Sequence, residues 1–366
     1  EVNGALLTNF GTITGTTDVN FGGQAQGIGT YGLVNITTGG LFQPGAGSNP
    51  PQLNFASVSG IAGNGTIDNA TAGGFMDLFV TGPSTSTFAG TIQNTIGLLQ
   101  LFLRNNASLT LLTSSQPAGG QSVNTYNGGS VISSGCTLTI GAVGALPTGG
   151  SVSNNGAFII NADSTCGQLG AGGTTTINTG ATLHISPSVG INSQLHIIFN
   201  GTGKLDLTNN ELLTNQTPAG IRALLSSGVI FSSSAGANTA LGYADQGGGV
   251  VEVKYTLRGD ANLDGKVDVG DLGALATAYG SSSGASWVQG DFNYDGAVNV
   301  GDLGALATNY GLSLAGGTAA AAADPSVLPL ARISAQAVIS PVPEPAGLAL
   351  IGMAVVGALK RRSRKV

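Results

Sequence analysis

The sequence predicts a mainly β protein: a β-solenoid, then a small all-α domain, then a C-terminal apolar helix. The first observation behind this prediction is composition. Glycine supplies 61 of the 366 residues, and charged residues make up only 8% of the chain, whereas glycine is ordinarily about 7% of a protein. With 41% hydrophobic residues, the chain is too apolar for a disordered protein. A turn-rich β fold is the interpretation that remains.

The second observation is strand-length alternation over residues 1–200. Short apolar segments such as TLTIG (137–141), AFIIN (157–161) and ATLHIS (181–186) are rich in β-branched residues and lie between turn formers. A phrase of two glycines followed by Ser or Thr recurs at residues 128, 149 and 172. This spacing suits the rungs of a solenoid, in which stacked rungs share one core.

Residues 201–257 form a different segment, which we expect to cap the solenoid. It contains one candidate short helix around GIRALLSSG (220–228) and an alternating strand, GVVEVKYTL (249–257). A solenoid needs such a cap because its terminal rung otherwise exposes an unpaired edge.

The third observation is a duplication over residues 258–311. DANLDGKVDVGDLGALATAYG (260–280) and DFNYDGAVNVGDLGALATNYG (291–311) are identical at 16 of 21 positions. Seven of the 18 acidic residues of the chain lie in this window. Each copy has oxygen-bearing residues at positions 1, 3, 5, 7, 9 and 12 of a 12-residue loop with Gly at position 6, the spacing that Ca²⁺ loops use.

The predicted ligands of the two Ca²⁺ ions are side chains, except at position 7, where the main-chain carbonyl is the ligand. They are Asp260, Asn262, Asp264, Lys266, Asp268 and Asp271 in loop one, and Asp291, Asn293, Asp295, Ala297, Asn299 and Asp302 in loop two. Crowded carboxylates repel one another unless a cation lies among them. We expect tighter binding at loop one, because it has four carboxylates and loop two has three. The alternative is a pair of solvated acidic turns.

A helix should follow each loop, with apolar residues at Leu272, Leu275, Ala276 and Tyr279 and at Leu303, Leu306, Ala307 and Tyr310. A strand precedes loop one, and Asp takes the place of the usual Glu at position 12. Residues 258–311 therefore resemble a type I dockerin. The resemblance implies Ca²⁺-dependent folding and docking onto a cohesin-like partner. The residues before position 12, Val269-Gly270 and Val300-Gly301, depart from the Ser-Thr that cellulosomal dockerins often have. We expect Trp287, between the two copies, to be a core residue.

The C-terminal end has a three-part pattern. Pro343, Glu344 and Pro345 precede 14 uncharged residues (346–359) and the basic segment KRRSRK. This order resembles a PEP-CTERM sorting signal. The resemblance implies export, processing near Pro343–Pro345 by an exosortase-type enzyme, and display at the cell surface or release. A permanent single-span membrane anchor is the alternative, with the basic residues on the cytoplasmic side. We interpret residues 312–342 as a flexible linker, and Glu1 as the start of a mature form or a fragment.

Residues 84–185 resemble the autotransporter-associated β-strand repeat, through STFAGTIQN (86–94), NTYNGGS (124–130) and ALPTGGS (145–151). The resemblance implies a right-handed solenoid in an exported protein. Cys136 and Cys166 are candidates for a disulfide, which export makes chemically possible. Two buried thiols are an equal alternative.

The residues exclude some functions and leave others open. Residues 1–359 carry seven basic and 18 acidic groups, which disfavours a nucleic-acid-binding protein. The sequence contains no nucleophile elbow, phosphate-binding loop or zinc spacing, and we interpret His184 and His196 as wall or packing residues, so an enzyme is not expected. The expected function is an exported structural or adhesive protein that contacts exopolysaccharide or envelope proteins. The alternatives are a cohesin-docking component and a β-helix enzyme acting on polysaccharide.

Overall fold

The computed structural model describes residues 1–314, apart from residues 5, 10–11, 21, 28–29, 38, 45–53, 70–74 and 113–123. The chain divides into two compact units, Glu1–Leu328 and Pro329–Val366, and every described residue belongs to the first. The predicted linker from residue 315 onward, the processing residues Pro343, Glu344 and Pro345, and the apolar segment 346–359 lie outside the described residues. Within the part that is described, none of the helices has both the length and the apolar character needed to cross a membrane.

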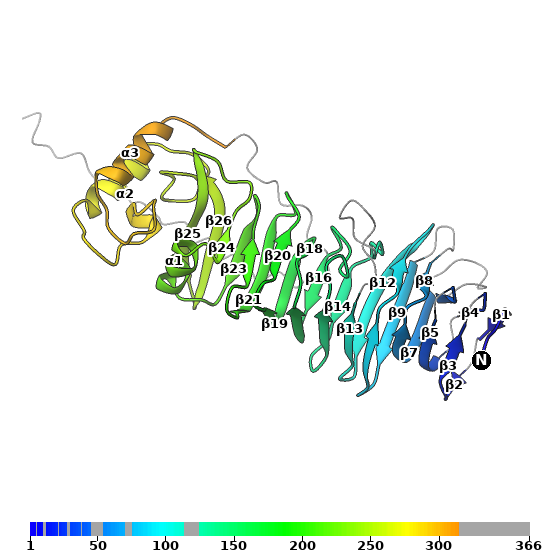
Figure 1. The fold of residues 1–366 in the computed structure, drawn as a ribbon. Coiled ribbons are helices and arrows are strands. Elements are labelled where there is room, and N and C mark those ends of the chain that lie inside the picture. Colours follow the sequence, from blue (N-terminus) through cyan, green and yellow to red (C-terminus); the bar gives the residue numbers. More distant parts are fainter. Residues whose placement is uncertain are drawn as a thin grey trace, which may run out of the picture. The chain divides into compact units, whose positions relative to one another are not determined.

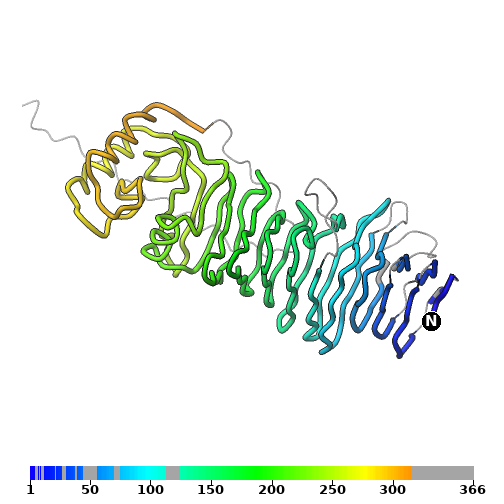
Figure 2. Tube along the Cα trace, viewed as in Figure 1, coloured from blue at the N-terminus to red at the C-terminus, as the bar shows by residue number. Residues whose placement is uncertain are grey.

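Parallel β-sheet is the main regular structure of the first unit, with strands stacked side by side along the chain (Figures 1 and 2). The largest sheet contains β2 (Thr12–Ile13), β3 (Thr17–Val19), β5 (Thr30–Ile36), β7 (Asn54–Gly63), β9 (Phe75–Thr81), β10 (Thr85–Phe88), β12 (Leu98–Arg104), β13 (Ser108–Leu111), β14 (Ser130–Ile132), β15 (Thr137–Ile140), β16 (Val152–Asn154), β17 (Ala157–Ile160), β19 (Leu169–Ile177), β21 (Ile191–Phe199), β23 (Glu211–Thr214), β25 (Thr239–Gly247) and β26 (Val250–Leu257).

Two smaller sheets complete the rungs. One contains β1 (Leu6–Thr8), β4 (Gln24–Gly27), β6 (Leu41–Pro44), β8 (Thr66–Asp68) and β11 (Thr91–Gln93); the other contains β18 (Ser164–Cys166), β20 (Thr182–Ile185), β22 (Lys204–Asp206) and β24 (Ile230–Phe231). All pairings in these two sheets are parallel. The predicted mainly β, solenoid-like architecture is therefore confirmed.

In the core, side chains at matching positions of successive strands stack into columns. Ile140 lies between Leu111 and Ile160 on the neighbouring strands, and the column continues to Phe88 at one end and Ile177 at the other. All five side chains are buried. Alternate residues point outward, as the burial pattern of β15 shows. Parallel stacking in register thus explains why each rung needs its neighbours for a core.

Asparagine side chains hold one turn of successive rungs in line. The amide of Asn178 donates to Asn161 at 2.6 Å, and the amide of Asn200 donates to Asn178 at 2.6 Å. Because each amide both donates and accepts, the ladder repeats along the stack.

The third glycine phrase does not stack in line with the first two. The first two phrases stack, since Ser130 is the register partner of Val152. The next partner of Val152 is Leu169, whereas Thr174 pairs with Ala157 of the following strand. In this rung a single long strand, β19, replaces the strand–turn–strand of earlier rungs, with an irregularity between Ala171 and Thr174.

Parallel pairing continues beyond residue 200, where the solenoid was predicted to end. In the largest sheet it ends at β23, which pairs in antiparallel fashion with β26, and in the second small sheet it ends at β24. The cap comprises the antiparallel hairpin β25–β26 and the helix α1 (Pro218–Ser226). Thr217 caps α1 and Pro218 occupies its first turn, as helix starts favour.

The duplicated segment folds into α2 (Val269–Ala278), the 3₁₀ turn η1 (Trp287–Gln289) and α3 (Val300–Asn309). Both predicted helices are present, but their buried faces differ from the prediction. Tyr279 and Tyr310 are 52% and 51% exposed, and Ala276 and Ala307 are exposed too. Each tyrosine is the C-cap of its helix, so its backbone has left the helical path and its side chain no longer continues the apolar face.

Cys136 and Cys166 are free thiols, and both are buried, which corresponds to the second of the two alternatives. They belong to different sheets, because Cys136 precedes β15 of the largest sheet and Cys166 lies in β18. Burial raises the pKa of Cys166 to about 12, so this thiol is protonated and unreactive in the folded chain.

Removing a side chain from the middle of the aliphatic column should destabilise the solenoid. We expect Ile140→Ala to lower the free energy of unfolding by about 2–5 kcal/mol, because the cavity has rigid neighbours above and below. The outward Thr139→Ala on the same strand should change it by about 0.5 kcal/mol or less. Chemical denaturation measures both; equal losses for the two variants would contradict the inward assignment.

Candidate metal centres

Two loops of matching geometry flank the helices of the duplicated segment. Loop one (260–271) runs from the end of β26 into α2, and loop two (291–302) runs from η1 into α3. Gly265 and Gly296, at position 6, have φ of 85° and 81°, a conformation that favours glycine. Leu263 and Tyr294, at position 4, also have positive φ. The predicted sharp turns are therefore present in both loops.

The first residue of each loop is a fully buried aspartate. Asp260 and Asp291 are both 0% exposed. Asp260 accepts hydrogen bonds from the backbone of Asp264 and Gly265 and from the hydroxyl of Thr256. In contrast, Asp291 Oδ2 accepts from Gly296 at 2.9 Å, and its buried Oδ1 accepts no hydrogen bond from the described part of the chain. A buried carboxylate oxygen without a donor is costly.

Positions 3 and 5 are exposed and bend the loops through short side-chain turns. Asn262 Oδ1 accepts from the backbone of Asp264 at 3.0 Å, and Asp264 Oδ1 accepts from Lys266 at 2.9 Å. Asn293 and Asp295 make the same two contacts in loop two, at 2.9 and 2.8 Å. The backbone carbonyls of Lys266 and Ala297, at position 7, accept no hydrogen bond from the described residues.

Positions 9 and 12 form capping boxes at the helix starts. Asp268 caps α2 and Asn299 caps α3, each accepting from a glycine amide at 2.8 Å. Asp271 and Asp302, both 1% exposed, accept from the backbone of the capping residues and from the loop start. These carboxylates therefore join the two ends of each loop, and the helix dipole favours their charge there.

The acidic side chains do not converge as closely as the sequence pattern suggests. Among the described residues, no three His, Cys, Asp or Glu side chains lie together as a metal-binding group. Amide and main-chain oxygens make up the rest of each predicted ligand set. The donor chemistry fits a hard cation, since every predicted ligand atom is an oxygen. The buried, unpartnered Oδ1 of Asp291 is the observation that points most directly to a missing positive charge.

The pKa values of the buried aspartates also indicate that a positive charge would stabilise the loops. Burial raises the pKa of Asp260 to about 6, and neighbouring Asp271 and Asp264 add to the rise, although hydrogen bonds from Thr256 and Gly265 oppose it. Burial and the charges of Asp295 and Asp302 raise the pKa of Asp291 to about 6, although the hydrogen bond from Gly296 and the charge of Arg222 oppose the rise. A raised pKa means that the ionised form is disfavoured in the folded chain, so ionisation at neutral pH costs stability unless a cation offsets it.

The two copies are interlocked. Val298 of loop two exchanges backbone hydrogen bonds with Gly280 and Ser281 after α2, and Val267 of loop one exchanges them with Gly311 and Leu312 after α3. A Cβ on Gly259 would lie 2.8 Å from Leu306 of α3, and one on Gly290 would lie 3.0 Å from Leu275 of α2. Each loop is thus tied to the helix of the other copy, so the two loops should fold together.

Trp287 and two residues of the cap donate hydrogen bonds to backbone carbonyls of the duplicated segment. The sequence singled out Trp287 but not the two cap residues. Trp287 is fully buried, as predicted, and its Nε1 donates to the carbonyl of Asp260 at 2.6 Å. Lys254 of β26 donates to the carbonyl of Leu263 at 2.9 Å, and Arg222 of α1 donates to that of Ala285 at 2.7 Å.

The duplicated segment 258–311, called the module below, also donates a hydrogen bond to the cap. The hydroxyl of Tyr294 donates to the carbonyl of Leu241 on β25 at 2.8 Å. A Cβ on Gly242 would lie 2.3 Å from Leu263 and 2.7 Å from Trp287. The module therefore packs closely against the last strand of the solenoid cap.

Three acidic residues of the N-terminal rungs are separated from one another. Asp18 accepts from Asn35, Asp68 accepts from Thr95, and Asp77 lies near Arg104. These three lie on different strands. His196 contacts Asn215, whereas His184 contacts Asp206 at 3.0 Å. Asp206 was not singled out from the sequence; the signal was its separation of 22 residues from His184, which is one rung.

Comparison with known proteins identifies one element of the chain. Residues 341–365 match the PEP-CTERM protein-sorting motif, which confirms the predicted sorting signal. No curated protein and no solved structure matches the chain. The motif indicates an exported protein that is anchored in the membrane or displayed at the cell surface, and exosortase processes proteins with this motif.

Calcium titration tests the two loops. We expect the chain to bind two Ca²⁺, more tightly at loop one because it has more carboxylates. Asp260→Asn and Asp291→Asn should each weaken binding at their own loop by at least about tenfold. Isothermal titration calorimetry after removal of metal with EDTA measures both affinities.

Asp245→Asn is the matched control, because Asp245 is an exposed carboxylate of the β25–β26 hairpin. It should bind Ca²⁺ like the unaltered chain. Absence of binding by the unaltered chain contradicts the assignment of the loops, and the reverse order of affinities contradicts the charge argument.

Proposed function

We propose that this chain is an exported, surface-associated structural protein whose solenoid is closed by a Ca²⁺-binding, dockerin-like module. The observation that carries the calcium assignment is the fully buried Asp291 carboxylate with an unpartnered Oδ1. The same loop position in the other copy holds the fully buried Asp260. Two buried anions in a duplicated oxygen-rich loop are most simply explained by a bound cation.

Each loop would hold one ion with the oxygens predicted from its spacing. Loop one would use Asp260, Asn262, Asp264, Asp268 and Asp271 with the carbonyl of Lys266. Loop two would use Asp291, Asn293, Asp295, Asn299 and Asp302 with the carbonyl of Ala297. When bound, Ca²⁺ supplies positive charge that offsets the repulsion among these carboxylates.

Calcium would act on more than the loops, because the module contacts the cap. The carbonyl of Asp260 holds the indole of Trp287, and Lys254 joins β26 to loop one. Ordering of the loops would therefore stabilise the hairpin that covers the last rung. A structural role in the calcium-containing extracellular environment follows from this coupling.

Assembly with an envelope protein is a second proposed role, which exposed apolar residues at equivalent places of the two copies favour. Val269 and Val300 precede position 12 of the two loops, and they are 71% and 72% exposed. Tyr279 and Tyr310 are exposed at equivalent places in the two copies. Single exposed apolar residues are common on protein surfaces, so the support for a protein-binding role is their repetition at equivalent places of the two copies. A cohesin-like protein is one candidate partner, and exopolysaccharide is the candidate partner of the neutral solenoid.

Several observations favour a structural protein over a polysaccharide-degrading enzyme. Glycosidases of the common type need two carboxylates on either side of the scissile bond, about 5–10 Å apart. Asp18, Asp68 and Asp77 of the solenoid are engaged with separate partners on separate strands.

Capture of envelope proteins tests the assembly role. Immobilised protein should retain a partner from the producing cell's envelope in Ca²⁺ and release it in EDTA, because the exposed surface depends on ordered loops. Asp260→Asn with Asp291→Asn should abolish the capture. Val269→Gln with Val300→Gln should abolish it too, while leaving calcium affinity unchanged.

The matched control is Ile198→Gln, which alters an exposed apolar residue of the solenoid. Capture that persists in EDTA, or that survives the double valine substitution, contradicts the assembly role of this surface.

A further inference from the structure

A pocket on the solenoid wall lies beside the His184–Asp206 pair. Its volume is about 220 Å³, and it is open to solvent. The loop before β16 contributes Val143, Leu146 and Thr148; the next rung contributes Asp163 and Thr165; and β20 contributes His184. Three successive rungs therefore meet at one place, which a linear motif in the sequence does not reveal.

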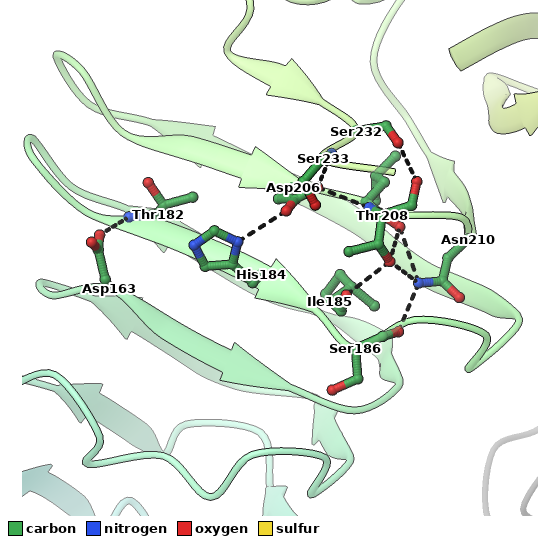
Figure 3. A network of polar contacts seen from close by, with 11 residues as sticks. Asp163, Thr182, His184, Ile185, Ser186, Asp206, Thr208, Asn210, Ser232 and Ser233 are labelled. Atoms are coloured by element: carbon green, nitrogen blue, oxygen red, sulfur yellow. Dashed lines mark hydrogen bonds and ion pairs between the residues drawn. The ribbon is translucent and has the colours of Figure 1, made fainter. Parts of the chain in front are cut away.

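The imidazole of His184 is held in a defined orientation. Its Nδ1 lies 3.0 Å from Asp206 Oδ2, and the carboxylate is 1% exposed while the imidazole side chain is 38% exposed. In Figure 3 the ring lies between Asp163 and Asp206, with Nδ1 turned toward Asp206. Register explains the contact, because Thr165, His184 and Asp206 are aligned on three adjacent strands.

Asp206 is built to remain ionised. Burial alone would raise its pKa, but hydrogen bonds from Ser233, His184 and Thr208 outweigh this effect and lower the pKa. Its Oδ1 accepts from the backbone of Thr208 and Ser233, both at 2.9 Å. An ionised carboxylate only accepts hydrogen bonds, so Nδ1 of His184 carries the proton. In the tautomer that carries the proton on Nδ1, the Nε2 of His184 is a hydrogen-bond acceptor, and no described residue donates to it.

Asp163 provides a second acceptor in the same pocket. Its Oδ1 accepts from the backbone of Thr182 at 2.8 Å, which fixes the carboxylate near the strand that carries His184 (Figure 3). Val143, 47% exposed, adds an apolar surface beside these acceptors. Among the described residues that line the pocket there is neither Lys nor Arg. The combination suits a neutral ligand with several hydroxyl groups and an apolar face, and it disfavours phosphate or carboxylate groups.

We propose that this pocket binds one ring of a neutral polysaccharide, with Asp163 and His184 accepting hydroxyl hydrogens and Val143 contacting the C–H face of the ring. The inference rests on the proposed contact of the solenoid with exopolysaccharide, and it names the place and the chemical class. Pockets for drug-sized ligands usually span about 300–1,000 Å³, so the smaller volume here fits a single ring. Asp206 is a positioning residue, because it is buried behind the imidazole.

The two histidines of the chain make a direct test possible. Two-dimensional long-range ¹H–¹⁵N NMR resolves their imidazoles, with His196 as the internal control because it is exposed and contacts Asn215. The probes are glucose, galactose and mannose, each compared with glucuronic or galacturonic acid. The pH is kept well above the ordinary His pKa of about 6.5.

We expect at least one neutral hexose to shift the His184 signals and to leave His196 unchanged, with a dissociation constant on the order of 1 mM. Asp163→Asn should weaken this binding at least about tenfold without changing the tautomer of His184. Asp206→Asn should change the tautomer pattern of His184 and weaken binding as well, which a merely structural role of Asp206 would not do.

The proposal is overturned if none of the neutral hexoses shifts His184, if the uronic acids shift it equally, or if Zn²⁺ shifts it and no sugar does. A calcium titration of the same sample separates this failure from that of the proposed function. Two bound Ca²⁺ with no sugar response contradict only the pocket. A sugar response without Ca²⁺ binding contradicts only the calcium module.

Discussion

A stack of parallel rungs ends in a strand edge that has no partner, and the described residues after β23 are arranged around covering that edge. The parallel ladder ends at β23, where β26 reverses the strand direction and pairs with it. β25 follows as the last strand, and Tyr294 donates to the carbonyl of Leu241 on it. The cap, the module and the loops are therefore successive layers over one exposed edge. Each layer depends on the next for its buried contacts.

This arrangement places the electrostatic cost of the module at the point where it affects the solenoid most. Asp260 is buried, its backbone holds Trp287, and Trp287 packs against Gly242 of the last strand. Uncompensated negative charge in loop one should therefore destabilise the adjacent cap. Loop two repeats the arrangement with fewer carboxylates and with an unpartnered Asp291 oxygen. In our proposal, calcium bound in the loops stabilises the β25–β26 hairpin that covers the last rung.

Local features of this chain could be predicted from sequence, whereas contacts between rungs could not. Strands such as β15 and β17 follow from alternation, and the helix starts at Asp268 and Asn299 follow from the duplicated loop pattern. The register of β19 could not be foreseen, because a rung can shorten without losing its glycine phrase. The contact of His184 with Asp206 depends on the register of β20 with β22. The exposure of Tyr279 depends on where the helix ends, which periodicity alone does not determine.

Hydrogen exchange of the β25–β26 hairpin tests the central claim, that calcium binding closes the solenoid, most directly. Mass spectrometry would follow amide exchange in peptides covering Thr239–Gly247 and Val250–Leu257, in Ca²⁺ and in EDTA. If calcium closes the solenoid, we expect the amides of the hairpin to exchange slowly in Ca²⁺ and faster in EDTA. In the Asp291→Asn variant they should exchange fast even with Ca²⁺. Protection confined to residues 260–271 and 291–302, with the hairpin unchanged, would contradict it.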